Sequence, residues 1–490
     1  MKQQQYCTVL LIFAILLFLT GCRSAPSETV VVSKNDGAFD VSAVQSETRN
    51  HDGETFDVSY SNTFFSTDES VTYHMEINQT LESNNMPIVK VSPYYLTSID
   101  AKRVATIFFP DAEFYEAEPE LKQYYSKQEI QEKIHRWSQY SNTNALEDLY
   151  GETMDDSYQE IVKKFIKDYT VKLETAPVEN PHEPCRWEMR KDSVYFLREE
   201  ELRKADTSED SEAVSTQFDV NGIPYCFTAT TRNKNDYKVN ILSCYIYDGI
   251  CPRNLDERIF AANLCRTEAP SQDQVEKIKE NTAQLLAMFD LGQWEINECY
   301  VSNKNYGDHE EYMVYVNAVP AFNDVPAIRC EQLIALRNQD GYASNHYLTD
   351  AEFIFSPNGD LISFSLFTPL TVEETINSNV KVMDMQELLS RAESHLKHTD
   401  SYNFYFGQFL GYIDEKVQCN VYVSEIVYGL SRIRLQDAED TYYYIPALML
   451  KGNVEYIGKE TNQTFYVSKK PEVLVTINAV DGTVINSTNE

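Results

Sequence analysis

The sequence predicts an α+β protein built from antiparallel sheets, each backed by one or two helices. Three observations lead to this prediction. Segments in which apolar and polar residues alternate occur along most of the chain, as expected of half-buried strands. Two pairs of such segments are separated by Asn-Gly or Asp-Gly, the strongest local signal for a hairpin. A few segments have the helical spacing of apolar residues, and each of these comes before a run of strands.

The first residues have the composition of an export signal. Lys2 is followed by a compact apolar run over residues 8–19, which ends in Leu19, Thr20, Gly21 and Cys22. This stretch resembles the lipobox of bacterial lipoproteins at every position. The resemblance implies cleavage before Cys22, a diacylglycerol anchor on its thiol, and a protein held at the cell membrane and facing outside the cytoplasm. A membrane-spanning helix, which needs about 20 apolar residues, and an ordinary secretory signal are the alternatives.

Changes in composition divide the rest of the chain. We expect a signal peptide over residues 1–21 and a polar, flexible tether over residues 22–53. An N-terminal α+β domain over 54–255, a middle α+β unit over 256–375 and a C-terminal α+β unit over 376–490 should follow.

The N-terminal domain should combine strands with two helices. Alternation predicts strands at 71–81 and 87–96, and we expect these two to be neighbours. Ser126 and Glu129 have the spacing of a capping box at the start of a helix. A second helix is predicted around residues 158–169, and a hairpin around 223–247.

The middle and C-terminal units have the same predicted order of elements. A helix begins after Ser271 and is followed by strands at 294–302 and 312–322 and by a hairpin with its turn at Asn358-Gly359. A helix at 383–396 is likewise followed by strands at 417–429 and 441–452 and a hairpin with its turn at Asp481-Gly482. This agreement indicates a duplicated helix-plus-hairpin unit, although two hairpins that need the same turn chemistry would look alike.

The segment INAVDGTVI, residues 477–485, resembles the closing strand–turn–strand of PepSY-type modules. These are small α+β units of secreted and membrane-attached bacterial proteins, often with regulatory or inhibitory roles. The layout of the whole chain also resembles a group of uncharacterised lipoproteins of clostridial-type Gram-positive bacteria. That second resemblance implies no activity and no functional residues.

Eight cysteines remain after Cys7 and Cys22 are set aside. Outside the cytoplasm an even number permits disulfides. Cys226 and Cys244 fall on the two strands of the predicted hairpin, nearly opposite each other. They are therefore the candidate pair for a disulfide, and free buried thiols are the default interpretation.

The charge of the chain limits its partners. A formal net charge of −34 repels nucleic acid and anionic lipid headgroups, so a nucleic-acid partner is not expected. We expect the membrane to be reached through the anchor on Cys22, with a membrane protein as a candidate partner.

No sequence pattern indicates an enzyme, a cofactor or a metal. The stretch from Gly452 to Thr461 has five residues between its glycines, where a phosphate-binding loop has four, and is predicted to be a turn between strands. His395 and His398 could chelate a metal from one helix, but His is also favourable at a helix C-terminus. The sequence therefore favours a non-catalytic surface binding or regulatory module that acts through protein contacts. A protein that binds a solute, sugar or peptide and a cell-wall hydrolase are the alternatives.

Overall fold

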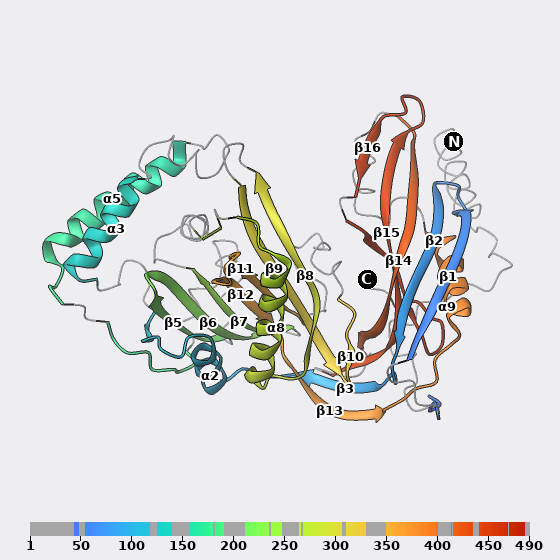
Figure 1. The fold of residues 1–490 in the computed structure, drawn as a ribbon, viewed down its shortest axis with the longest axis horizontal. Coiled ribbons are helices and arrows are strands. Elements are labelled where there is room, and N and C mark those ends of the chain that lie inside the picture. The colour runs from blue at the N-terminus through green and yellow to red at the C-terminus, as the bar shows by residue number, and fades with distance from the viewer. Residues whose placement is uncertain are drawn as a thin grey trace, which may run out of the picture.

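The computed structural model confirms the α+β class and contains two large antiparallel-rich sheets (Figure 1). It describes residues 44–48, 54–117, 125–139, 156–179, 182–190, 211–234, 237–246, 264–265, 268–305, 310–329, 349–399, 413, 415–434, 441–468 and 470–485.

The first sheet combines strands from the N-terminal and C-terminal parts of the described chain. It has eight strands, ordered β1-β2-β14-β15-β3-β13, with β16 and β17 also paired to the long strand β15. The bounds are β1 Glu54–Phe65, β2 Val71–Ser83, β3 Ile88–Pro93, β13 Leu370–Asn377, β14 Val417–Arg434, β15 Tyr442–Gly458, β16 Thr464–Val467 and β17 Glu472–Asn478. Helix α9, Met385–Leu396, packs its apolar face (Leu388, Leu389, Ala392 and Leu396) into the core of this sheet.

The second sheet is formed by the middle of the chain. It has nine strands, ordered β10-β9-β11-β12-β7-β6-β5-β4, with β8 also paired to β9. The bounds are β4 Tyr115–Glu116, β5 Ser211–Val220, β6 Ile223–Lys234, β7 Tyr237–Ile246, β8 Trp294–Asn305, β9 Glu310–Phe322, β10 Val325–Pro326, β11 Ala351–Phe355 and β12 Leu361–Phe367. Helices α2, Ser98–Phe108, and α8, Gln272–Phe289, contact each other and contribute to its core.

Two further helices form a separate pair at the far end of the second sheet (Figure 1). They are α3, Lys127–Gln139, and α5, Asp156–Thr175, and they enclose a small core of their own around Trp137, Val162 and Tyr169. As predicted, α3 begins with a capping box. The Ser126 N–H donates to Glu129 Oε2 at 2.7 Å, and the Glu129 N–H donates to Ser126 Oγ at 3.3 Å.

The two sheets share a third core, so they pack against each other. Its buried residues come from both sheets and include Val319 and Phe322 from β9 and Leu430 and Tyr444 from β14 and β15. Backbone pairing continues across the join, because Ala327 forms an isolated parallel bridge with Leu430. The Ile328 N–H also donates to the Leu430 carbonyl at 2.7 Å.

The predicted repetition of elements corresponds to a repeated topology. After α8, strand β8 pairs with β9, β9 with β11, and β11 with β12, all antiparallel. After α9, β14 pairs with β15 and β15 with β17, and a bridge between Ile477 and Val484 closes the last turn. In both units the turn glycine, Gly359 or Gly482, has positive φ. Gly359 lies close to Ile278 of α8, and Gly482 lies close to Arg391 of α9 and to Met383 just before it.

The sheets do not follow the predicted domain boundaries. Strands of residues 54–255 divide between both sheets, and β13, predicted to be in the middle unit, pairs with β3 in the first sheet. The predicted neighbours 71–81 and 87–96 are also separated, because β2 pairs with β1 and β14 whereas β3 pairs with β13 and β15. The predicted pairing of 71–81 with 87–96 was wrong because it assumed that segments close in sequence pair with each other.

The predicted tether is shorter than 22–53 at its C-terminal end. Ser46 forms a bridge with Val380, and the Glu47 N–H donates to the Asn379 carbonyl at 2.8 Å. Val44 also packs beside a small buried cluster. Residues 44–48 therefore belong to the folded body.

Candidate functional site

The predicted anchor residues Leu19, Thr20, Gly21 and Cys22 lie outside the described residues. Among the helices that are described, none combines the length and the apolar character that a membrane crossing requires.

The candidate disulfide between Cys226 and Cys244 is not formed, because of the strand register. Cys226 is opposite Tyr245, and Phe227 is opposite Cys244. Since successive side chains point to opposite faces of a sheet, the two thiols lie on different faces. Both side chains are fully buried, in agreement with the default interpretation of free buried thiols.

The two histidines considered as metal ligands are not part of a larger group of ligating side chains among the described residues. Burial lowers the pKa of His395, whereas His398 is exposed and its Nδ1 lies 3.3 Å from Thr67 Oγ1. Within the described part of the chain, no group of three or more His, Cys, Asp or Glu side chains is placed to hold a metal ion.

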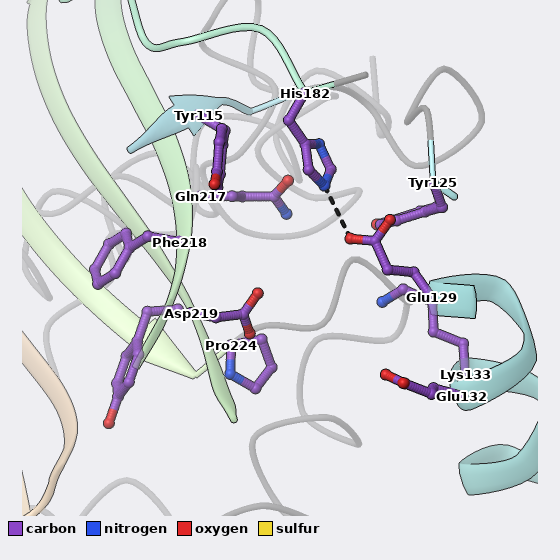
Figure 2. Close-up of a pocket in the computed structure, with 11 residues that line it drawn as sticks. Tyr115, Tyr125, Glu129, Glu132, Lys133, His182, Gln217, Phe218, Asp219 and Pro224 are labelled. Carbon is purple, nitrogen blue, oxygen red and sulfur yellow. Dashed lines mark hydrogen bonds and ion pairs between the residues drawn. The ribbon is translucent and has the colours of Figure 1, made fainter. Parts of the chain in front are cut away.

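A pocket lies where the helix pair meets the edge of the second sheet (Figure 2). Tyr115 comes from β4, Asp219 from the end of β5 and Pro224 from the start of β6. Helix α3 and the residues just before it contribute Tyr125, Glu129, Glu132 and Lys133. The segment after α5 contributes His182. The cavity volume is about 110 Å³.

His182 joins the two walls of the pocket. Its Nε2 lies 3.1 Å from Glu129 Oε1 on α3, and its ring centroid lies 4.8 Å from that of Tyr115 on β4. The segment that carries His182 is fixed to β4, because Pro184 forms a bridge with Tyr115 and the Glu116 N–H donates to the Glu183 carbonyl at 2.8 Å.

Glu129 is kept ionised in this position. Burial alone would raise its pKa, but hydrogen bonds from His182 and from the backbone and hydroxyl of Ser126 outweigh burial and hold the pKa below its ordinary value. The residue that caps α3 therefore also supplies a carboxylate to the pocket.

Aromatic rings form much of the remaining wall. Tyr125 and Phe218 are buried, and Tyr115 is half-buried. A hydrogen bond to Glu113, together with burial, raises the pKa of Tyr115 to about 12, so this phenol is neutral at physiological pH. The ammonium group of Lys133, a buried side chain, lies 4.5 Å from the ring centroid of Tyr125.

The thiol closest to the pocket along the chain is not an activated one. The nearest thiol along the chain is that of Cys185, three residues after His182, and burial raises its pKa. A thiol with a raised pKa stays protonated at neutral pH and is a poor nucleophile.

A second candidate surface lies along β8. This strand is 12 residues long, and in the described part of the chain it pairs only with β9. No β8 residue with a described side chain is buried, whereas most of β9 is. Tyr300 is 51% exposed and Val301 40% exposed. A groove of about 470 Å³ lies between β8 and α8, and Val275, Ile296 and Cys299 contribute to its lining.

Sequence reasoning found only part of these surfaces. It identified Glu129 as a capping residue and residues 294–302 as a strand, but it did not single out Tyr115, His182 or Asp219. The one local signal at His182 is its place between Pro181 and Pro184, a composition that favours a fixed extended segment.

No family model and no curated protein matches the chain. Among solved structures, an uncharacterized protein from Eubacterium rectale ATCC 33656 is similar, with a TM-score of 0.34 and 11% sequence identity. The similarity covers 86% of this chain and 92% of that chain. At this TM-score the similarity carries no conclusion about function.

Proposed function

We propose that this protein is a lipid-anchored, non-catalytic binding module outside the cytoplasm that acts through contact with another protein. The observation that supports this most is the exposed edge of β8 beside the groove under α8. The partner is an extended segment of a membrane protein, which adds a strand to β8.

The edge of β8 has the properties of a strand-addition site. A long edge strand presents a row of backbone donors and acceptors to any chain that can pair with it. Natural proteins commonly protect such edges with lysines, prolines, β-bulges or very short strands. β8 contains no proline, its single lysine, Lys304, is next to its last residue, and its register irregularity lies between Ile296 and Glu298, so residues 299–303 lack these protections.

The charge around β8 favours a basic partner segment. The groove lining includes Glu276 and Glu298 and one amine, Lys279, and the chain as a whole carries a net charge of −34. Lys279 is itself paired with Glu276, at 3.4 Å between Nζ and Oε1. Complementary charge would speed the encounter with a basic segment and disfavour acidic ones.

The anchor supports the choice of a membrane protein. A diacylglycerol on Cys22 supplies two acyl chains, which hold a protein stably at a bilayer. Residue 44 already belongs to the folded body, so at most about 20 residues separate the body from the anchor at Cys22. A flexible chain of that length has a root-mean-square span of roughly 25 Å, which keeps the body close to the membrane surface.

Site-specific crosslinking in intact cells tests this proposal. A photoreactive phenylalanine analogue at Tyr300 should crosslink to one dominant membrane protein. The same analogue at Tyr422, which is 43% exposed on the first sheet, should not. Equal crosslinking at both positions, or none at Tyr300, would contradict the proposal.

A charge substitution tests whether the strand edge is responsible. Val301→Lys places a cation on β8 and should reduce recovery of the crosslinked partner several-fold, because lysine protects a strand edge and repels a basic segment. Val372→Lys is the matched control, since Val372 is an exposed valine, 51% accessible, on the edge strand β13 of the other sheet. If both variants reduce recovery equally, β8 is not the docking strand.

A further inference from the structure

We infer that the pocket between α3 and the β5–β6 turn binds the ammonium group of a small organic cation. This goes beyond the proposed protein contact at β8, because it concerns a different surface and a different class of ligand.

The size and shape of the pocket set the first limit on its ligand. Its volume is about 110 Å³, which suits an ammonium head group with a short carbon chain. Figure 2 shows Asp219 and Lys133 extending into the space from opposite walls, with Glu129 and His182 above them. A ligand in this space would contact both the helix pair and the sheet.

The charge of the lining favours a cation. Glu129, Glu132 and Asp219 supply three carboxylates, and Lys133 supplies one ammonium group. The carboxylate of Glu129 is partly withdrawn from solvent, with 30% of the side chain exposed, so its field is less screened than that of a fully exposed acid. An anionic ligand would meet this excess of negative charge.

The aromatic walls favour the same ligand. A cation is attracted to the face of an aromatic ring when it lies within about 6 Å of the ring centroid. Tyr115 and Tyr125 place such rings on the pocket wall, where His182 lies against the Tyr115 ring and the Lys133 ammonium group over the Tyr125 ring.

The protein already places one ammonium group in this environment. Lys133 is only 6% exposed, and its Nζ lies 4.5 Å from the Tyr125 centroid, at the edge of the pocket. An ammonium ion is costly to bury unless its surroundings compensate for lost hydration. Lys133 therefore marks the wall as favourable to ammonium, and it competes with an external amine for the same ring.

Titrations with three small probes test the inference. The full chain is purified in detergent, and binding of n-butylamine, 1-butanol and butyrate is followed by ligand-observed nuclear magnetic resonance at about 150 mM NaCl, a physiological ionic strength. Butylamine should bind, whereas the neutral and anionic probes of the same length should not. Equal binding of butylamine and butanol, or preferential binding of butyrate, would overturn the inference.

Three variants separate a built site from general attraction to an acidic protein. Asp219→Asn and Glu132→Gln should each weaken butylamine binding about threefold, the size expected for one partly exposed ion pair. Glu160→Gln, which removes an exposed acid from α5 outside the pocket, should leave binding unchanged. Equal weakening by all three would show unspecific charge attraction and contradict the site.

Lys133→Met should have the opposite effect on butylamine binding from the two acid substitutions, and it is the most decisive variant. Removal of the competing ammonium should strengthen butylamine binding several-fold, while methionine keeps most of the buried side-chain volume. Circular dichroism is the check that the Lys133→Met variant is folded. If Lys133→Met abolishes binding instead, the lysine itself holds the ligand and the ammonium assignment is wrong.

Discussion

Asp350 is a buried carboxylate near the join between the two sheets. Its side chain is 3% exposed and lies 3.1 Å from Arg329 Nε and 3.4 Å from Asn317 Nδ2. Its Oδ1 is buried without a hydrogen-bond partner among the described residues. Burial raises the pKa of Asp350 to about 6, and the nearby Arg329 only partly offsets this effect.

This raised pKa predicts a pH-dependent stability. The folded chain keeps the proton of Asp350 up to about pH 6, whereas the unfolded chain loses it near pH 4, so stability falls as the pH rises through this window. Asp350→Asn should remove that fall, which amounts to at most about 3 kcal/mol. Urea unfolding of both proteins at a series of pH values across this window measures it.

Glu352→Gln is the matched control for Asp350, because Glu352 also pairs with Arg329 but its side chain is 48% exposed. The control should retain the fall in stability across the same window. An unchanged pH dependence in Asp350→Asn would show that another group is responsible.

Single residues show where sequence reasoning succeeds and where it fails. The Ser126–Glu129 capping box was predictable because both partners lie within one turn. The Cys226–Cys244 pairing failed on a register difference of one residue, which moves a side chain to the other face of the sheet. Register depends on contacts along the entire hairpin, so spacing alone cannot fix it.

At the level of elements, many strands and helices with strong periodicity were predictable, but others were not, among them strands β1, β5 and β13 and helix α2. Helix α2 was missed. It begins with a capping box between Thr97 and Asp100, where the acidic residue is aspartate and not the usual glutamate. The predicted turn at 452–461 also proved partly wrong, because residues up to Gly458 continue β15.

The glycine that suggested a turn at 452 has a packing role within β15. A Cβ atom there would lie 2.5 Å from the Tyr422 carbonyl oxygen on β14. Gly452→Ala should therefore lower the free energy of unfolding by about 1–3 kcal/mol, the usual cost of overpacking. Thermal unfolding at constant pH measures this loss.

Gly222 offers the contrasting case. It lies in the β5–β6 turn with φ of +79°, and a Cβ atom added there would have no other atom within 4 Å. Gly222→Asn should be nearly neutral, because asparagine tolerates this conformation and has room there. If Gly222→Asn destabilises as much as Gly452→Ala, close approach is not the cause.

At the scale of the whole molecule, the order of units along the chain predicted the repeated helix-and-strand topology but not the sheets. Their composition follows from long-range pairing, such as the parallel contact between β2 and β14. The pocket at His182 was equally out of reach, because its residues come from α3, the segment after α5 and the strands of the second sheet. Only the folded chain brings these segments together.

The anchor predicted at Cys22 determines where such a molecule can act. Cys22→Ala removes the thiol that would carry the lipid, so labelled palmitate should no longer be incorporated and the lipobox should no longer be cleaved. Gly21→Leu should also block processing, because a large side chain hinders the peptidase, but it leaves the thiol available for lipid. Palmitate labelling and the mobility of the protein in gel electrophoresis distinguish the two variants. Normal labelling of Cys22→Ala would refute the anchor and, with it, the membrane-bound setting of the proposed contact at β8.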